Sequence, residues 1–365
     1  MGISTVTGIP DSALKPFCDY MNGDGGKIFC HYVPANEGAA VGIAVGSFLA
    51  SGKPACIYAQ NSGLGNMVNP ITSLMNREVY GIPALFLIGW RGEPGTKDEP
   101  QHKFMGMITE KMLGVLQIRY SVLKAGMPED EIEDRFAKAK AAVDAGFQYA
   151  FVIAGGFFDM EERKVYQNGY ALSREMAVRE MVLSAGDADI FVSTTGKISR
   201  ELYEQSDRIK GYHRQAFLTV GGMGHASMAA FGIAKERPDR RVYCLDGDGA
   251  VLMHMGSLAF LGRQGPDNLV HVCLDNCAHE SVGGMPVGSA GLDYAEAAAA
   301  CGYPAAYSVE TISELKKLLA AIQERHVLTF LNIKVSIGSR PDLGRPKETA
   351  VENKDSFMRH LGGRK

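Results

Sequence analysis

The chain has 365 residues, which is enough for two domains of ordinary size. Hydrophobic residues make up 46% of it and charged residues 22%, an ordinary globular composition that excludes disordered and fibrous proteins. The 38 basic and 41 acidic residues leave a formal net charge of −3 with no block of like charge, so composition gives no reason to expect binding to nucleic acid or to an anionic membrane.

Short apolar or β-branched runs alternate with longer helical patterns along the first half, which is typical of βα units that build a parallel sheet. We expect strands at 27–33, 55–59, 84–89 and 149–154, and helices at about 37–51, 64–77 and 129–145. The segment 157–173 is polar and aperiodic, and we place a domain boundary there.

The second half shows the same alternation. We expect strands at 190–194, 216–220, 242–245, 270–274 and 328–335, and helices near 174–184, 225–236, 251–264, 294–301 and 312–325. Thr311 and Glu314 form a capping box before the last of these helices. By itself, the tail from Ser339 is expected to be an irregular, solvated arm, although Arg340 and Arg345 could close over an anionic site. The prediction is two parallel-sheet α/β domains, at 1–165 and 166–365.

Neither membrane insertion nor disulfide formation is indicated. The longest apolar stretch, 82–90, is far shorter than the ~18–20 residues that span a bilayer, and the N-terminus has neither region of a signal peptide, so we expect a cytoplasmic protein. The seven cysteines include no Cys-x-x-Cys pair, and Cys56, Cys244 and Cys273 lie in apolar runs. We therefore expect reduced core thiols rather than a zinc site or a disulfide framework.

Two polar positions follow neighbouring predicted strands. Asp248 lies between Gly247 and Gly249 after the strand at 242–245, and Asn276 follows the strand at 270–274, one strand–helix–strand crossover later. Adjacent parallel strands would present the two side chains together, beside a helix N-terminus that offers N–H groups to phosphate. A carboxylate, an amide oxygen and a nearby loop carbonyl suit Mg²⁺ shared with phosphate oxygens.

This arrangement resembles the motif of thiamine diphosphate enzymes, in which Gly-Asp-Gly is followed one crossover later by a dipeptide ending in Asn. Asp275 departs from the pattern, since many members have Asn there, but the second position is the one that usually ligates the metal. The resemblance implies thiamine diphosphate and Mg²⁺ as cofactors, with Mg²⁺ held by Asp248, Asn276 and the carbonyl of Ala278.

Glu37 begins the helix expected at 37–51. By itself, a carboxylate in the first turn could serve only the helix dipole. The resemblance implies a catalytic role instead, in which Glu37 hydrogen-bonds the aminopyrimidine ring of the cofactor.

Several longer stretches resemble the phosphonopyruvate decarboxylase family. They are QNSGLGN (60–66), WRGEPG (90–95), DEPQH (98–102), TVGGMGHAS (219–227), LDGDGAVLMHMG (245–256) and DNCAHESVGGMPV (275–287). The resemblance covers nearly the whole chain. It implies a pyrimidine-binding domain and a diphosphate-binding domain with no middle domain, decarboxylation of a 2-keto acid that carries a phosphonate, a place in phosphonate biosynthesis, and at least a homodimer with active sites between chains.

The resemblance also implies the cofactor contacts. The diphosphate would be lined by residues from two strand ends: Thr194, Thr195, Gly196, Gly247, Gly249 and Ala250. Met223, between Gly222 and Gly224, would be the bulky residue under the bend of the cofactor, although an ordinary core methionine is the other reading.

A substrate with a carboxylate and a phosphonate needs cations and hydrogen-bond donors. The candidate substrate-binding residues are Asn61, Ser62, Arg91, His102, Arg340 and Arg345. The segment 90–102 also contains acidic residues and could instead be a neutralised surface lid. The acid that protonates the product stays open among His31, His102, His225 and His279.

Three alternatives remain at this point. A sulfopyruvate decarboxylase would have similar domains, and a sulfonate would carry less charge than a phosphonate. A nucleotide-binding oxidoreductase is disfavoured because no Gly-x-Gly-x-x-Gly lies between a strand and a helix. A catalytically silent cofactor-binding protein is disfavoured by the presence of Glu37.

Overall fold

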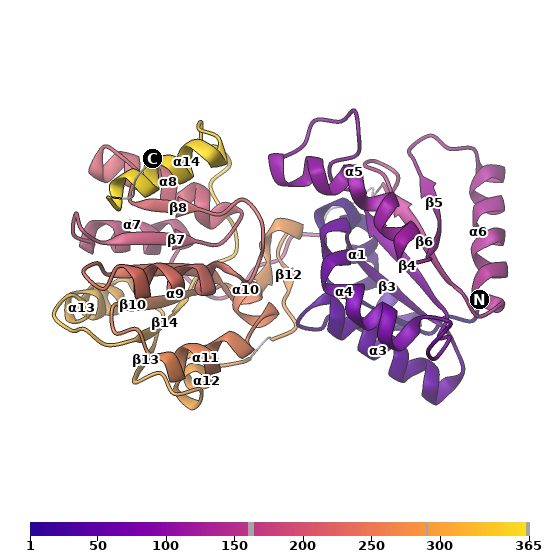
Figure 1. The fold of residues 1–365 in the computed structure, drawn as a ribbon, viewed down its shortest axis with the longest axis horizontal. Coiled ribbons are helices and arrows are strands. Elements are labelled where there is room, and N and C mark those ends of the chain that lie inside the picture. The colour runs from indigo at the N-terminus through magenta and orange to yellow at the C-terminus, as the bar shows by residue number, and fades with distance from the viewer. Residues whose placement is uncertain (160–163, 290, 363–365) are drawn as a thin grey trace. The chain divides into compact units, whose positions relative to one another are not determined.

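The computed structural model describes residues 1–159, 164–289 and 291–362, which group into two compact units (Figure 1). One unit contains Met1–Val165 together with Ser281–Gly288, and the other contains Tyr166–Glu280 and the chain from Ser289 onward. Each unit holds a six-stranded sheet with helices, and every strand pair in the two sheets is parallel, so the α/β fold class is confirmed. The segment Ser281–Gly288 lies within the predicted second domain but groups with the first unit.

The N-terminal unit has the strand order β2-β1-β3-β4-β6-β5. Its strands are β1 (Thr5–Gly8), β2 (Cys30–Tyr32), β3 (Ala55–Gln60), β4 (Ala84–Gly89), β5 (Arg119–Leu123), β6 (Gln148–Ile153) and the short β12 (Met285–Pro286). Its helices are α1 (Lys15–Met21), α2 (Gly25–Ile28), α3 (Glu37–Ser51), α4 (Leu64–Pro70), α5 (Pro100–Val115) and α6 (Glu129–Asp144), with short turns η1 (Ser12–Leu14), η2 (Asn61–Gly63) and η3 (Ile71–Met75). The small residues of α3 and the apolar side chains of α4 pack on β3 and β4 in one core.

The C-terminal unit has the strand order β13-β14-β10-β9-β7-β8. Its strands are β7 (Ile190–Ser193), β8 (Ala216–Leu218), β9 (Val242–Gly247), β10 (Leu269–Asp275), β11 (Ala278–His279), β13 (Ala305–Val309) and β14 (Thr329–Lys334). Its helices are α7 (Arg174–Ser184), α8 (Lys197–Lys210), α9 (Ala226–Glu236), α10 (Asp248–Met253), α11 (Gly256–Gln264), α12 (Tyr294–Ala300), α13 (Ile312–Gln323) and α14 (Ala350–His360), with the turn η4 (Glu280–Val282).

Alternate residues of the central strands in this unit enter different cores. Phe191 and Tyr243 pack with α7, α8 and α13 on one face, whereas Val192 and Cys244 pack with α9, α11 and α12 on the other. Helices cover both faces, so the strands read as continuous apolar runs, which is why their positions could be predicted. Cys56, Cys244 and Cys273 are buried and free, as expected.

Several predicted elements were wrong. The strand expected at 27–33 is partly α2, and β2 is a three-residue edge strand that is largely solvent-exposed. The helix expected at 251–264 is two helices, because the chain leaves helical geometry at His254, whose ring stacks on His225 with centroids 4.4 Å apart. The helix expected at 64–77 ends as the π-helical turn η3 at Met75. Strands β1, β5 and β13 and helices α1, α5 and α8 were not predicted.

The tail is not an irregular arm. Thr349 and Glu352 form a capping box at the start of α14, and Phe357 on that helix is 4% exposed and lies in a core of the C-terminal unit. The ring of His213, in the α8 to β8 connection, lies between Asp207 and Glu348 of the tail at 2.7 and 2.9 Å.

The predicted capping box at α13 is confirmed. Among the described residues, no helix has both the length and the apolarity needed to cross a bilayer.

Candidate cofactor and metal site

Asp248 stands where a buried strand meets a helix in the C-terminal unit. β9 ends at Gly247, and Asp248 is the first residue of α10. Its side chain is 3% exposed, and its carboxylate accepts hydrogen bonds from the backbone N–H groups of Gly249 (2.7 Å) and Ala278 (3.1 Å). A buried carboxylate therefore lies at the carboxyl end of the sheet, where parallel α/β folds bind ligands.

Asn276 reaches the same place from the neighbouring strand. β10 pairs with β9, with Leu274 opposite Gly247, and Asn276 follows the last residue of β10. Its Oδ1 atom accepts a hydrogen bond from the N–H of Ala278 at 3.1 Å, so this one N–H group binds both Asp248 and Asn276. The structure thus brings the three predicted metal-binding residues together.

The local electrostatics favour a cation here. Burial raises the pKa of Asp248, and the nearby carboxylate of Asp275 raises it further. Lys334 forms an ion pair with Asp275. A divalent cation would stabilise ionised Asp248, and two oxygen-bearing side chains with a backbone carbonyl are a donor set that Mg²⁺ prefers. The residues present therefore fit a magnesium ion.

Backbone N–H groups suited to a phosphate lie at two strand ends of the same sheet. Thr194 and Thr195 follow β7, which pairs with β9, and Gly196 precedes α8 with φ +96°. Within the described parts of the chain, no side chain caps the first turn of α8, so its N–H groups are available to an anion. Gly249 and Ala250 occupy the first turn of α10. We predicted the diphosphate at these two turns. The N–H of Gly249 already donates to Asp248 and that of Thr194 to the carbonyl of Leu245, so the first turn of α8 is the better supported of the two.

Met223 faces the first turn of α10. A Cβ atom placed on Gly249 would lie 3.2 Å from the Cε atom of Met223 and 3.6 Å from the ring of His279. Gly222 and Gly224, on either side of Met223, have φ of +66° and +85°, which glycine adopts without strain. Met223 therefore lies in a turn between two positive-φ glycines, beside the first turn of α10, and not in a core helix.

His279 lies at this site, although from the sequence we considered it only as one of four possible acids. Its Nε2 atom is buried and has no hydrogen-bond partner among the described residues. Burial lowers the pKa of His279 to about 4, so the ring is neutral near pH 7 and carries no proton to give as an imidazolium. The signal in the sequence was its place in the loop that begins at Asn276.

Glu37 lies in the N-terminal unit at the start of α3. Asn36 caps this helix by accepting a hydrogen bond from the N–H of Ala39 (2.9 Å). Glu37 is 6% exposed, and its Oε2 atom accepts a hydrogen bond from the side chain of Asn66 at 2.7 Å. Burial raises the pKa of Glu37, although the bond from Asn66 opposes the shift. A carboxylate that served only the helix dipole would not need burial, so the structure favours a functional role.

Comparison with known proteins places the chain in a family. Residues 1–113 match the N-terminal and residues 194–333 the C-terminal TPP binding domain of thiamine pyrophosphate enzymes. Phosphonopyruvate decarboxylases of Streptomyces viridochromogenes and Streptomyces hygroscopicus are 37% and 35% identical to it, over 96% and 95% of this chain and 90% and 88% of theirs. The chain belongs to the phosphonopyruvate decarboxylase family. A sulfopyruvate decarboxylase of Methanosarcina acetivorans is 27% identical over 87% of this chain and 85% of its own.

Membership in the phosphonopyruvate decarboxylase family makes this chain a carboxy-lyase, as predicted. Both matched domains bind thiamine pyrophosphate, which is another name for thiamine diphosphate, so the predicted cofactor class agrees with the family.

Two of the candidate substrate residues follow β3. Asn61 is fully buried, donates hydrogen bonds to the backbone carbonyl of Arg91 (2.8 Å) and the hydroxyl of Thr109 (2.9 Å), and accepts one from the N–H of Arg91 (3.3 Å). Its amide group therefore fastens the ends of β3 and β4 together. Ser62 is exposed and donates to the side chain of Gln60 at 2.7 Å.

Arg91 and His102 follow β4. The Arg91 guanidinium binds Asp98 through two hydrogen bonds of 2.9 and 2.6 Å and donates a third to Ser12 at 3.0 Å. His102 lies not in a loop but in the first turn of α5, where burial lowers its pKa and the charge of Arg91 lowers it further. Arg91 is thus paired within the segment, as expected for a neutralised lid, and its charge is close enough to His102 to lower the pKa of that ring.

Arg340 in the tail is paired with carboxylates of its own unit. Arg340 forms ion pairs with Glu175 of α7 (3.0 Å), with Glu204 of α8 and with Asp342 (2.9 Å). These three carboxylates neutralise Arg340 and give it a role in fastening the tail, which argues against a substrate contact. Arg345 lies in the connection between β14 and α14.

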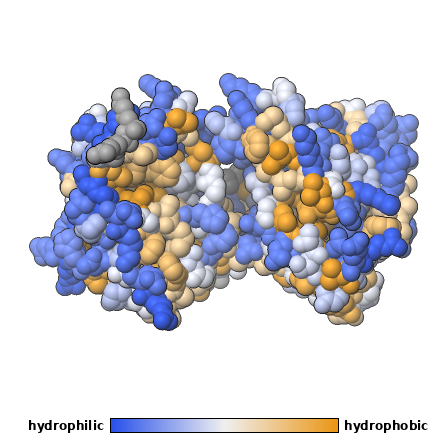
Figure 2. Space-filling view, in the orientation of Figure 1, coloured by the Kyte–Doolittle hydropathy of each residue, from blue (hydrophilic) through white to orange (hydrophobic). Residues whose placement is uncertain are grey.

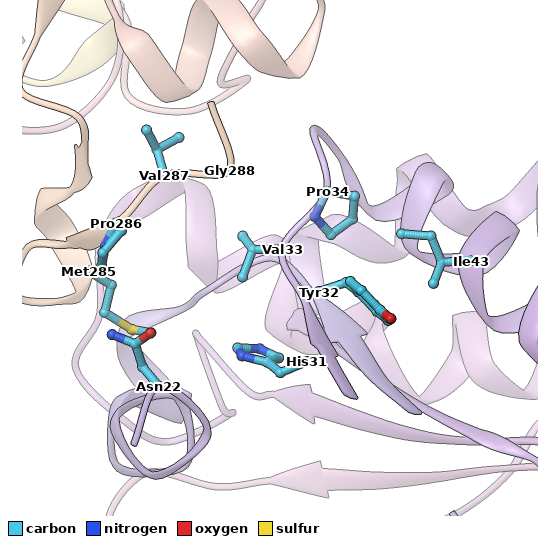
Figure 3. A pocket seen from close by; sticks show the side chains of 10 residues that line it. All are labelled: Asn22, His31, Tyr32, Val33, Pro34, Ile43, Met285, Pro286, Val287 and Gly288. Atoms are coloured by element: carbon cyan, nitrogen blue, oxygen red, sulfur yellow. The ribbon is translucent and has the colours of Figure 1, made fainter. Parts of the chain in front are cut away.

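A cavity of about 480 Å³ lies in the N-terminal unit beside the start of α3 (Figure 3). Its lining residues are Asn22, His31, Tyr32, Val33, Pro34, Ile43, Met285, Pro286, Val287 and Gly288. His31 hydrogen-bonds the hydroxyl of Tyr58 at 2.8 Å, and burial lowers its pKa. Of the predicted site residues, only His31, one of the four candidate acids, is among the lining residues of this cavity.

A second polar cluster, which we did not predict from the sequence, lies inside the C-terminal sheet. Cys244, Asp246 and His271 place their ligand atoms within 4.8 Å of one another, a geometry that could hold a metal ion. The groups already have partners: His271 bonds Asp246 and the hydroxyl of Tyr303, both at 3.1 Å. We interpret this buried cluster as support for the end of β9, since it fixes the strand just before Asp248.

Proposed function

We propose that this chain catalyses the thiamine diphosphate- and Mg²⁺-dependent decarboxylation of 3-phosphonopyruvate to phosphonoacetaldehyde and CO₂, in phosphonate biosynthesis. The observation that carries the proposal is the convergence of Asp248 and Asn276 on the N–H of Ala278, beside two strand-to-helix turns that suit a diphosphate. The substrate is inferred from the two Streptomyces relatives, which are named for phosphonopyruvate.

Each protein group has a defined task in this proposal. Asp248, Asn276 and the carbonyl of Ala278 hold Mg²⁺, and Met223 supports the bend of the cofactor. Glu37 hydrogen-bonds the aminopyrimidine ring, and burial raises its pKa, which favours proton exchange with a ring nitrogen. When bound, thiamine diphosphate supplies the nucleophilic carbon and accepts the electron pair that remains when CO₂ leaves.

The substrate carries a carboxylate and a phosphonate, and the remaining basic candidates are few. Arg91 and His102 lie at the carboxyl end of the N-terminal sheet, but Arg91 is already paired with Asp98. Binding through Arg91 therefore requires the phosphonate to share the guanidinium or to displace the carboxylate, which a dianion does more effectively than a monoanion.

The proposal includes a cytoplasmic homodimer or larger homo-oligomer, with active sites completed by a second copy. Exposed apolar side chains support it. Figure 2 shows hydrophobic residues gathered over the region of α4 and α5, where Val68, Leu74, Phe104 and Met107 are 38%, 36%, 65% and 54% exposed. Light scattering that finds an active monomer at assay concentration would contradict this part.

The substrate is tested by assaying phosphonopyruvate and sulfopyruvate side by side. Chelator-treated protein is reconstituted with thiamine diphosphate, with and without Mg²⁺, and aldehyde and CO₂ are measured. We expect a higher kcat/KM for phosphonopyruvate and no turnover without the metal. A higher kcat/KM for sulfopyruvate would assign the chain to the other reaction, and turnover of neither acid would overturn the proposal.

The role of Glu37 is tested with a matched pair of variants. Glu37→Gln and Glu129→Gln each remove a carboxylate from the first residue of a helix, α3 and α6 respectively. If Glu37 served only the helix dipole, both changes would cost well under about 1 kcal/mol of stability and no activity. We expect decarboxylation to be lost in Glu37→Gln alone.

A further inference from the structure

A buried ionic cluster lies behind the predicted metal site. Arg174, at the start of α7, is 3% exposed and binds both carboxylate oxygens of Glu201 on α8, each at 2.7 Å. Arg174 also forms an ion pair with Glu280, and Lys197, the first residue of α8, binds the same carboxylate at 3.0 Å. The cluster thus contains two cations and two anions, which balance in a poorly solvated place.

Glu280 also contacts the predicted metal ligand. The Oε2 atom of Glu280 accepts a hydrogen bond from Nδ2 of Asn276 at 2.9 Å, while Oδ1 of Asn276 accepts one from the N–H of Ala278 at 3.1 Å. Only one orientation of the amide satisfies both contacts. In the reverse orientation, the amide oxygen would face a carboxylate and the NH₂ group would face an N–H donor.

We propose that Glu280 is a positioning residue that holds the side-chain oxygen of Asn276 toward the metal, and that Arg174 and Lys197 hold Glu280 in place. The inference rests on the proposed magnesium site. A free amide can turn either face to the cation, and only the oxygen binds it. Groups of this kind, one step behind a metal ligand, typically change metal affinity ~10–100-fold when they are removed.

The cluster also connects the two halves of the proposed site. Lys197 directly follows Gly196 in the turn suited to phosphate, and Glu280 belongs to the loop that carries Asn276 and Ala278. Because both contact the same ion pair, the diphosphate turn and the metal loop are held in one arrangement before any ligand arrives.

A purely structural role would give a different result. In that case the cluster would only hold α7 and α8 together. Removing either of the two carboxylates that bind Arg174 would then have the same consequences. Glu201 and Glu280 each bind Arg174, but only Glu280 contacts Asn276. Glu201→Gln is therefore the matched control for Glu280→Gln.

The substitution Glu280→Gln tests the orientation of Asn276 directly, because the new amide is expected to adopt only one orientation. Oε1 of Glu280 faces Lys197 as well as Arg174, so the oxygen of the new amide stays there and its NH₂ group faces Asn276. Two NH₂ groups then oppose each other, and Asn276 is expected to turn its oxygen away from the metal.

The test measures Mn²⁺ binding at saturating thiamine diphosphate by electron paramagnetic resonance, together with unfolding of the metal-free variants. We expect Glu280→Gln to weaken Mn²⁺ binding ~10–100-fold, with Glu201→Gln within about threefold of the natural protein and both variants similarly destabilised. Equal Mn²⁺ affinities in the two variants would overturn the inference. If Glu280→Gln does not fold, the second variant is Lys197→Met, which changes a partly exposed side chain. We expect Lys197→Met to weaken Mn²⁺ binding as well. Unchanged Mn²⁺ binding in Lys197→Met would also overturn the inference.

These outcomes are separable from those of the proposed function. A natural protein that binds Mn²⁺ with the cofactor but decarboxylates neither keto acid would defeat the proposed reaction and leave the role of Glu280 standing. Turnover of phosphonopyruvate with unchanged Mn²⁺ binding in Glu280→Gln would defeat the role of Glu280 alone.

Discussion

Gly63 offers a way to displace Glu37 without changing it. Gly63 ends η2 with φ −67°, so alanine fits its backbone, but a Cβ atom there would lie 2.6 Å from Oε1 of Glu37 and 2.8 Å from its Cγ and Cδ atoms. Ordinary contact begins near ~3.5 Å, so the Glu37 carboxyl group must move by roughly 1 Å. The hydrogen bond from Asn66 at 2.7 Å cannot survive that movement unchanged.

The expected effect of Gly63→Ala is larger on catalysis than on folding. A misplacement of about 1 Å at a reacting group costs about 100-fold in rate, whereas one extra methyl group in a packed site costs about 1–3 kcal/mol of stability. We therefore expect kcat to fall about 100-fold at saturating cofactor, while the protein remains folded in denaturant titrations.

Gly65→Ala is the control. Gly65 lies two residues away in α4 and is exposed. Apart from the backbone of its own helix, no atom of the described residues lies within 4 Å of the position of a new Cβ. Alanine is a better helix former than glycine by up to about 1 kcal/mol, so this variant should be as active as the natural protein and slightly more stable. The reasoning is refuted if Gly63→Ala keeps its full kcat, or if Gly65→Ala loses as much.

Three further predictions follow from the C-terminal unit. Burial raises the pKa of Asp248 in the metal-free protein, so Mg²⁺ binding with thiamine diphosphate should release protons and strengthen as pH rises. Calorimetry that gives the same heat of binding in buffers of different ionisation enthalpy would count against this prediction. Burial disfavours charged His213, but its hydrogen bonds to Glu348 and Asp207 outweigh that effect and raise its pKa. The tail is therefore stabilised fully below pH ~6.5 and loses this stabilisation as pH rises through the raised pKa. The protection factors of the α14 amides, which correct each exchange rate for its intrinsic rise with pH, should therefore fall over that range, but not in His213→Gln. Thr349→Ala removes the cap of α14 and should cost about 1 kcal/mol in denaturant unfolding, and no measurable cost would show that the cap is dispensable.

The sequence was informative wherever the signal is local. The helix from Glu37 to Ser51 and the strand from Ala84 to Gly89 were predicted with their observed bounds, because a capped small-residue helix and a continuous apolar run are each specified by neighbouring residues. The spacing of Asp248 and Asn276 also sufficed to place them together, since one crossover between adjacent parallel strands leaves little freedom.

Contacts between distant segments were decided only by the tertiary structure. Arg340 looked like a ligand for an anion in the sequence, but folding surrounds it with three carboxylates from α7, α8 and the tail. Glu280 looked unremarkable, yet Arg174 is brought against it from 106 residues away. The sequence determines the charge of a side chain, but the packing of distant elements determines which partner that side chain meets. The partner in turn determines whether the charge is available to a ligand or stabilises the fold.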